Sequence, residues 1–294
     1  MFMAVLLTDP ATPLLEEATV AALRNAWGGG PVRWLQAGVA AEFPLESLPG
    51  NLWQVWADLQ AMGIDLAVVP QAGRRKRLLL ADMDSTMIQQ ECIDELADMA
   101  GVGAYVAAIT ERAMNGELDF EAALRERVGL LKDMPVGIID TVIAERITFM
   151  PGGATLVATM KAAGGRAVLV SGGFTDFTAR VAAGLGFDEH RANILLTRDG
   201  RLTGQVAEPI LGREAKVTAL LEVTAQMGVA DADVIAVGDG ANDLGMLGQA
   251  GMGVALHAKP VVAAQCDLRV NHGDLTALLF LQGYAREEFA PPRA

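Results

Sequence analysis

The chain has 294 residues, of which 52% are hydrophobic, and its formal net charge is −13. This composition excludes a disordered chain, and the acidic excess argues against a nucleic-acid partner, because phosphate binding needs clustered Lys and Arg. No apolar run reaches the roughly 18 residues that cross a bilayer. The two cysteines, Cys92 and Cys266, form no CxxC pair. We therefore expect a cytoplasmic globular protein with reduced thiols and no membrane partner.

The N-terminal part alternates apolar runs with helical periodicity. We expect strands at 3–8, 31–37 and 64–69 and helices at 13–27 and 51–62. The apolar start has no basic leader, so we interpret it as a strand and not as a secretory signal. Residues 74–77 (RRKR) are interpreted as a solvated linker that follows a domain of residues 1–73.

After this connector, short apolar runs lead into polar turns and then into helices. The runs are Leu78–Ala81, 167–170 and 234–237. Their alternation with helices predicts βαβ units, and hence a doubly wound parallel sheet within residues 77–294. Residues 89–149 are helical in pattern and hold no clear strand, which predicts a helical cap inserted over the sheet.

Acidic residues follow two of these runs. Asp82 and Asp84 come directly after the first run, and Asp239 and Asp243 follow the third within GDGAND. Carboxylates gathered at one sheet edge repel one another unless a cation lies between them, and hard oxygen ligands suit magnesium. Taken alone, the first motif is explained equally well by ordinary turn chemistry, and the second is explained better by an ordinary Asp-Gly turn.

Two further elements could hold a phosphate group. Ser171 and Gly172 stand between a strand and a predicted helix at 175–185, where a hydroxyl and free amides can cradle an anion. A plain helix cap is the alternative interpretation. Lys216 lies near the start of another predicted helix, and taken alone it reads as a surface lysine.

In this order, the motifs resemble those of the haloacid-dehalogenase superfamily of phosphatases. They are DMDST at 82–86, SGG at 171–173, Lys216 and GDGAND at 238–243. QQECIDE at 89–95 and FEAALRERVGLL at 120–131 are similar to the phosphoserine phosphatase family in particular. The resemblance covers residues 77–274, and the N-terminal pattern is loosely similar to ACT-like, ferredoxin-type α+β domains.

The resemblance implies hydrolysis of O-phosphoserine to serine and phosphate, the last step of serine biosynthesis, through a phosphorylated Asp82. It implies Mg²⁺ held by Asp82, Asp84 and Asp239, with Asp243 behind them. Asp84 would be the general acid, and Lys216 would assist catalysis beside the phosphate. The implied substrate-binding residues are Glu91, Met114, Phe120, Arg127, Ser171, Gly172, Lys216 and Asn242.

Substrate choice is expected to depend on the cap. In the family, the positions of Glu91 and Arg127 take the amino and carboxylate groups of phosphoserine, whereas without that context both would be ordinary surface charges. Met114 and Phe120 would form an apolar lid, or simply pack in the core. Arg125 is expected to face solvent, because it lies two residues from Arg127 on the same predicted helix.

Three alternatives stay open. A related phosphomonoesterase could act on phosphothreonine, phosphohomoserine or phosphoglycolate. The N-terminal domain could make the chain chiefly an amino-acid sensor, and it could also form a homodimer. Residues 74–77 could contact nucleic acid, although the net charge disfavours this.

Overall fold

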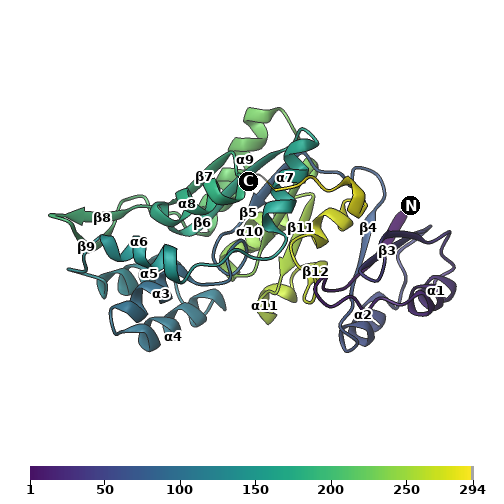
Figure 1. Ribbon diagram of the computed structural model, residues 1–294, viewed down its shortest axis with the longest axis horizontal. Coiled ribbons are helices and arrows are strands. Elements are labelled where there is room, and N and C mark those ends of the chain that lie inside the picture. The colour runs from purple at the N-terminus through teal and green to yellow at the C-terminus, as the bar shows by residue number, and fades with distance from the viewer. Residues whose placement is uncertain (293–294) are drawn as a thin grey trace.

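The computed structural model describes residues 1–292, which form three parts along the long axis of the molecule (Figure 1). An N-terminal unit lies at one end, a group of helices lies at the other, and a parallel sheet stands between them. Within residues 1–292, no helix has both the length and the apolar character needed to cross a membrane.

The central sheet has six strands in the order β12-β11-β10-β5-β6-β7, and all neighbours pair in parallel. The strands are β5 (Leu78–Ala81), β6 (Arg166–Phe174), β7 (Glu189–Asn193), β10 (Val234–Gly238), β11 (Met252–Leu256) and β12 (Leu268–Val270). The strand order reverses between β5 and β10, and ligands bind beyond the strand ends at such a point. The predicted doubly wound parallel sheet is confirmed.

Helices cover both faces of this sheet because alternate strand residues point to opposite sides. Leu79 and Ala81 of β5 pack with one set of helices, and Leu78 and Leu80 pack with the other. The first set is α7 (Gly153–Ala162), α8 (Thr175–Leu185) and α12 (Ala277–Leu281). The second set is α9 (Arg213–Met227), α10 (Leu244–Gln249) and α11 (Pro260–Ala263). Burial on both faces explains why β5, β6 and β10 contain continuous apolar runs. The edge strand β7 (EHRAN) is polar and partly exposed.

The segment between β5 and β6 is helical, as the sequence predicts. Its helices are α3 (Cys92–Met99), α4 (Gly103–Met114), α5 (Phe120–Gly129) and α6 (Gly137–Glu145). A hairpin of β8 (Leu195–Arg198) and β9 (Arg201–Val206) packs against α5. This hairpin was not predicted, because its short strands are partly exposed and mix apolar with polar residues. We call the four helices the cap.

The N-terminal unit is an antiparallel sheet with the order β2-β3-β1-β4. Its elements are β1 (Phe2–Leu7), α1 (Glu17–Ala26), β2 (Arg33–Gln36), β3 (Ala40–Leu45), α2 (Leu52–Gln60) and β4 (Asp65–Pro70). The βαββαβ order is that of ferredoxin-like units. The expected α+β unit is confirmed, whereas its likeness to ACT domains and its role in a homodimer stay predictions. Strand β3 was not predicted, because Glu42 and Pro44 interrupt its apolar run.

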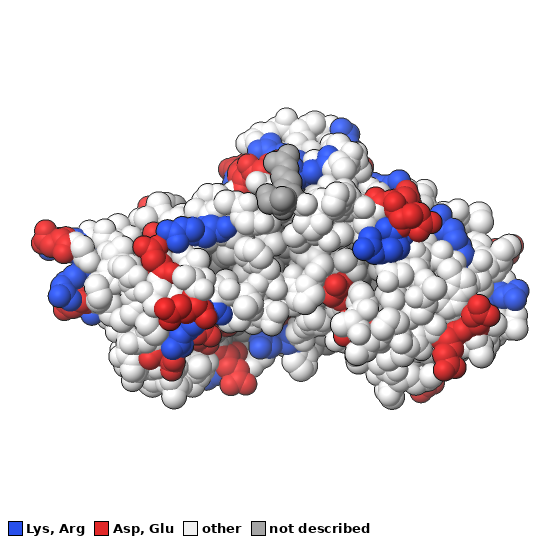
Figure 2. Space-filling model, viewed as in Figure 1, with Lys and Arg blue, Asp and Glu red and all other residues white. Residues whose placement is uncertain are grey.

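The interpretation of residues 74–77 as a solvated linker is wrong for Arg74. Its side chain is 9% exposed, and its guanidinium donates hydrogen bonds to Glu42 Oε2 at 2.8 Å and to the Leu281 carbonyl at 3.1 Å. Glu42, which lies on β3 and far from Arg74 in sequence, supplies the negative charge that makes burial of the Arg74 side chain favourable. On the face of the molecule in Figure 2, Lys and Arg are interspersed with Asp and Glu, without a continuous basic patch.

Candidate active site

Two strands bring carboxylates together at the edge of the central sheet. Asp82 follows β5 and Asp239 follows β10, and these strands pair side by side, with Ala81 opposite Val237. The Asp82 amide donates a hydrogen bond to the Val237 carbonyl at 3.0 Å. Carboxylate oxygens of Asp82, Asp239 and Asp243 lie within 4.8 Å of one another, and all three residues are buried. The predicted convergence of these acids is confirmed.

Lys216 reaches the same place from α9 and is 1% exposed. Its Nζ donates hydrogen bonds to Asp82 Oδ1 and to Asp243 Oδ1, each at 2.6 Å. Burial opposes the charge of Lys216, but the neighbouring carboxylates outweigh it and raise the pKa of the lysine above its ordinary value. The lysine is therefore a buried cation and not a surface residue.

Asp243 is fixed by the turn that carries it. Its Oδ2 accepts hydrogen bonds from the backbone amides of Asp239 at 3.2 Å and Gly240 at 3.0 Å. A side chain at Gly238 would collide with the Asp243 carboxyl group, so the turn needs glycine at this position. Since Oδ1 binds Lys216, both oxygens of Asp243 already have partners in the protein.

The buried carboxylates lack positive charge, since three of them share one ammonium group. Burial and the charge of Asp243 raise the pKa of Asp82 well above its ordinary range, although Lys216 acts in the opposite direction. The same causes raise the pKa of Asp239 to about 7. Hard oxygen donors that are desolvated and short of counter-charge fit a divalent cation. Asp82 and Asp239 are the candidate ligands, because the oxygens of Asp243 are occupied.

Asp84 points toward the cap and toward Ser171. Its Oδ1 accepts a hydrogen bond from the Cys92 amide at 2.8 Å, and its Oδ2 accepts one from Ser171 Oγ at 3.2 Å. Burial raises the pKa of Asp84 above its ordinary value. Ser171, Gly172 and Gly173 belong to the end of β6, which continues directly into α8, and do not form a separate turn. The Gly173 amide donates to Ser171 Oγ at 2.8 Å.

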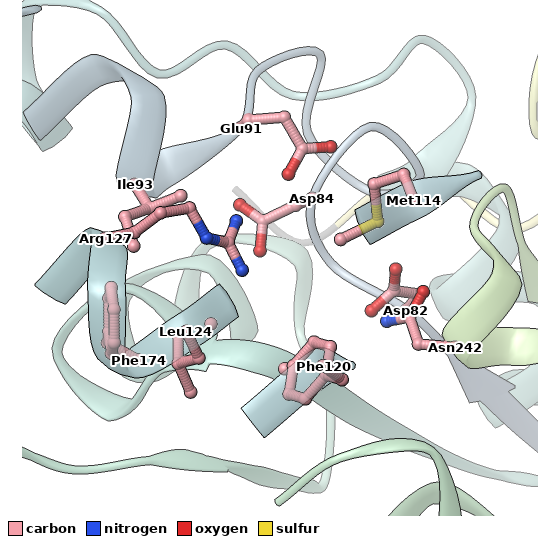
Figure 3. Close-up of a pocket in the computed structure, with 12 residues that line it drawn as sticks. Asp82, Asp84, Glu91, Ile93, Met114, Phe120, Leu124, Arg127, Phe174 and Asn242 are labelled. Atoms are coloured by element: carbon pink, nitrogen blue, oxygen red, sulfur yellow. The ribbon is translucent and has the colours of Figure 1, made fainter. Parts of the chain in front are cut away.

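A pocket between cap and core joins most of the predicted substrate-binding residues. It is lined by Asp82, Asp84, Glu91, Ile93, Met114, Phe120, Leu124, Arg127, Gly172, Gly173, Phe174 and Asn242. Figure 3 shows Glu91, Asp84 and the guanidinium of Arg127 facing one another, with Met114 and Phe120 nearer Asp82. Ser171 and Lys216, also predicted to bind substrate, contact Asp84 and Asp82 next to this pocket.

The cap touches the core where the core carries glycine. A Cβ atom on Gly172 would lie 2.6 Å from Phe120 Cζ, and one on Gly240 would lie 2.9 Å from Met114 Sδ. Real Cβ atoms do not come this close, so the cap can close to this extent only over glycine. Met114 and Phe120 of the cap therefore lie over the pocket and against the core, as expected of an apolar lid.

The charged cap residues differ sharply in exposure. Arg127 is 2% exposed, and Glu91 Oε1 accepts a hydrogen bond from Ser85 Oγ at 2.6 Å. Burial, followed by the charge of Asp84, raises the pKa of Glu91 well above its ordinary range. Arg125 is exposed and pairs with Glu208 at 2.6 Å, as expected.

Two residues that contribute to the site behind Arg127, Thr110 and Asp94, were not predicted from the sequence. Arg127 Nη1 donates a hydrogen bond to Thr110 Oγ1 at 3.0 Å, and Thr110 Oγ1 donates one to Asp94 Oδ1 at 2.5 Å. Asp94 is part of the stretch at 89–95 that carries the family resemblance, but nothing in its spacing points to Arg127.

Comparison with known proteins gives consistent matches. The sequence model of the haloacid dehalogenase-like hydrolases matches residues 79–248. A phosphoserine phosphatase of Polaromonas sp. is 49% identical over 210 residues, which cover 70% of this chain and 89% of that protein. The crystal structure of a HAD family hydrolase from Salmonella enterica serovar Typhi has a TM-score of 0.84 at 31% identity, covering 96% of this chain and 98% of that one. A phospho-aspartyl intermediate analogue of phosphoserine phosphatase has a TM-score of 0.67 at 40% identity, covering 70% and 98%.

Proposed function

This chain belongs to the haloacid dehalogenase-like hydrolases, and on that premise we propose that it is a phosphoserine phosphatase that works with Mg²⁺. The observation that carries the proposal is the pocket itself: an acid, Glu91, and a buried cation, Arg127, line the same space as Asp82. These two charges complement the amino and carboxylate groups of an amino acid. The relative from Polaromonas sp. supports the same substrate.

Asp82 is the nucleophile of the proposed reaction. One of its oxygens attacks the phosphorus atom while the bond from phosphorus to the serine oxygen breaks, which leaves an aspartyl phosphate and releases serine. Water then attacks that phosphorus, the bond to Asp82 breaks, and inorganic phosphate leaves. Lys216, 2.6 Å from Asp82 Oδ1, favours the anionic form of the nucleophile and lies beside the charge of the phosphoryl group.

Asp84 is the proposed general acid and base. Its raised pKa favours the protonated carboxyl group that must give a proton to the departing serine oxygen. The resulting carboxylate then takes a proton from the attacking water. Its hydrogen bonds from the Cys92 amide and from Ser171 Oγ fix its direction for both steps.

Magnesium would be held by Asp82, Asp239 and the backbone carbonyl of Asp84. The bound ion would supply the positive charge that Asp82 and the phosphate need to approach each other. Asp243 positions Lys216 and the Asp239 turn from behind, and Ser171 and Gly172 cradle the phosphate. Asn242 lines the pocket, and its Oδ1 is a buried acceptor with no partner among the described residues, so we assign it a substrate contact.

The test is a comparison of four substrates. Purified protein with Mg²⁺ is given phosphoserine, phosphothreonine, phosphoethanolamine and phosphoglycolate, and phosphate release is measured. We expect the highest kcat/KM for phosphoserine, because phosphoethanolamine lacks the carboxylate and phosphoglycolate lacks the amino group. Equal or better turnover of phosphoglycolate would contradict the role of Glu91 and favour a different phosphomonoesterase.

A further inference from the structure

Arg127 is buried, and no acidic side chain among residues 1–292 pairs with it directly. Its side chain is held by two hydrogen bonds among residues 1–292, from Nε to the Ala123 carbonyl at 3.1 Å and from Nη1 to Thr110 Oγ1 at 3.0 Å. A guanidinium has five donor hydrogens, so several stay available to a molecule in the pocket. Glu91 and Asp84 face the guanidinium across that pocket.

Thr110 links Arg127 to a carboxylate on a third helix. Thr110 lies on α4 and is 3% exposed, Asp94 lies on α3, and Arg127 lies on α5. A hydroxyl group has one proton, and when Thr110 gives it to Asp94 Oδ1 at 2.5 Å, its lone pairs are left for Arg127. Asp94 therefore fixes which way the hydroxyl points. The Val106 carbonyl, 3.1 Å away, is the competing acceptor.

The hydroxyl between the two charges has a chemical consequence. A direct pair between Arg127 and Asp94 would use the two parallel donors with which a guanidinium grips a carboxylate. Because Thr110 lies between them, Asp94 compensates the buried positive charge of Arg127 without contacting the guanidinium. The Thr110 hydroxyl occupies a single N–H donor of that guanidinium. The remaining donors keep a fixed direction and stay free for a ligand.

We propose that Thr110 and Asp94 are positioning residues that hold the Arg127 guanidinium for the substrate carboxylate, and so set the preference for phosphorylated amino acids. The inference rests on the proposed function, in which Arg127 binds that carboxylate. Neither residue lines the pocket. Their effect is therefore confined to substrates that carry a carboxylate.

Thr110→Val tests this, because valine keeps the shape of threonine and removes the hydroxyl. We expect kcat/KM for phosphoserine to fall about 10- to 100-fold, mainly through KM, as for the loss of a hydrogen bond to a charged group. Phosphoethanolamine has no carboxylate, and its kcat/KM should change less than about threefold. Thr110→Ser restores the hydroxyl and should recover most of the phosphoserine activity.

Two further variants complete the design. Asp94→Asn removes the charge that orients the hydroxyl and should lower phosphoserine kcat/KM in the same selective way, which keeps the test open if Thr110→Val does not fold. Thr141→Val is the matched control, since the Thr141 hydroxyl bonds only within its own helix, to the Gly137 carbonyl at 3.3 Å. It should leave both substrates unaffected.

The outcomes separate the two proposals. Equal losses on both substrates, or no loss on either, would overturn the positioning role. If the unmodified protein does not prefer phosphoserine to phosphoethanolamine, the proposed function fails before any variant is compared. Selective loss in Thr110→Val with recovery in Thr110→Ser supports both.

Discussion

At the scale of single residues, negative charge exceeds positive charge at the ends of β5 and β10. Asp82, Asp239 and Asp243 are buried together, and Lys216 contacts Asp82 and Asp243 directly. Desolvated carboxylates without counter-charge are costly, and the cost is lowered when a metal ion binds or when a proton is retained. The site is therefore prepared for positive charge before any substrate arrives.

Replacing the nucleophile tests the central residue. Asp82→Asn keeps the side chain's shape but removes the oxygen anion that would bond to phosphorus. We expect phosphatase activity to fall by about 10⁴- to 10⁶-fold, the scale on which loss of a covalent nucleophile acts. Circular dichroism should be unchanged. Asp58→Asn, at an exposed position on α2, is the control and should retain full activity; residual activity of Asp82→Asn within tenfold would place the nucleophile elsewhere.

The pKa of Asp239 predicts how magnesium binding depends on pH. Its folded value of about 7 lies above the ordinary 3.8, so the metal-free folded protein retains a proton there that the unfolded chain has lost. The free energy of unfolding of the metal-free protein should therefore fall as pH rises from about 4 to 7. Mg²⁺ competes with this proton, so it should stabilise the protein more at pH 8 than at pH 5.5.

Thermal unfolding with Mg²⁺ or with a chelator, measured across this pH range, checks the magnesium prediction. The melting temperature gained from Mg²⁺ should grow as the pH rises through about 7, the pKa of Asp239. Asp82 acts in the same direction, since its pKa is also raised. A gain in melting temperature that does not change with pH would contradict the assignment of these carboxylates.

At the scale of elements, closure of the cap depends on the absence of a side chain at Gly172. Alanine there would place Cβ 2.6 Å from Phe120 Cζ, so the Phe120 ring, or the helix α5 that carries it, must shift. We expect Gly172→Ala to lower kcat/KM for phosphoserine by at least about tenfold, because small displacements at a site are costly. Steady-state kinetics measures this loss, and Phe120→Leu in the same chain should recover part of it.

Gly184→Ala is a matched control for Gly172→Ala. Its Cβ would lie at the same 2.6 Å from a phenylalanine ring, that of Phe149. The Phe149 side chain lies outside the pocket and is 45% exposed, so its ring can turn into solvent. Near-normal kinetics in Gly184→Ala together with a loss in Gly172→Ala would assign the effect to the cap, whereas unchanged kinetics in both would refute it.

Strands β5, β6 and β10 were predictable because each contains a continuous apolar run that leads into polar residues, whereas β7 (EHRAN), β11 and β12 (LRV) of the same sheet were not predicted. Leu78–Ala81 leads into Asp82, and the run at 234–237 leads into Asp239, so the parallel sheet and its acidic edge could be inferred together. Strand β3 could not, because Glu42 faces a buried partner that only the folded chain supplies. The β8–β9 hairpin was missed because its strands are short and place apolar residues such as Leu195 beside polar and charged ones.

The contacts that tune the site were not predictable for a related reason. Asp94, Thr110 and Arg127 meet because three helices pack together, and each residue in isolation has the spacing of an ordinary helix position. Lys216 was placed only through family resemblance, since no local pattern distinguishes it from a surface lysine. The local sequence pattern therefore predicts where strands end, but it does not predict which side chains come into contact when helices pack together.

At the scale of the whole molecule, the N-terminal unit shares a hydrophobic core with the central part. Met3, Val5 and Leu7 of β1 belong to the same buried cluster as Leu278 of α12. Asp65, at the start of β4, is fully buried and accepts hydrogen bonds from the amides of 271–273, each at 2.9 Å. These contacts predict that the two parts unfold together.

Arg74 offers the sharpest test of that coupling. Its buried guanidinium pairs with Glu42 of β3 and binds carbonyls at the end of α12. In Arg74→Ala, Glu42 stays buried and keeps one cation, the half-exposed Arg33 at 3.1 Å. We expect the free energy of unfolding to fall by about 2 kcal/mol, less than for a buried carboxylate left with no partner. Arg75→Ala is the control: the Arg75 side chain is 52% exposed, and its pair with Glu288 should contribute less than about 1 kcal/mol.

Urea unfolding followed by two probes measures both effects of Arg74. All four tryptophans lie in the N-terminal unit, so their fluorescence reports that unit, whereas far-ultraviolet circular dichroism reports the whole chain. In the unmodified protein the two transitions should coincide, because one core holds both parts. In Arg74→Ala both midpoints should move to lower urea, with fluorescence moving at least as far. Separate transitions in the unmodified protein, or equal shifts in Arg74→Ala and Arg75→Ala, would mean that the N-terminal unit folds independently of the sheet that carries Asp82.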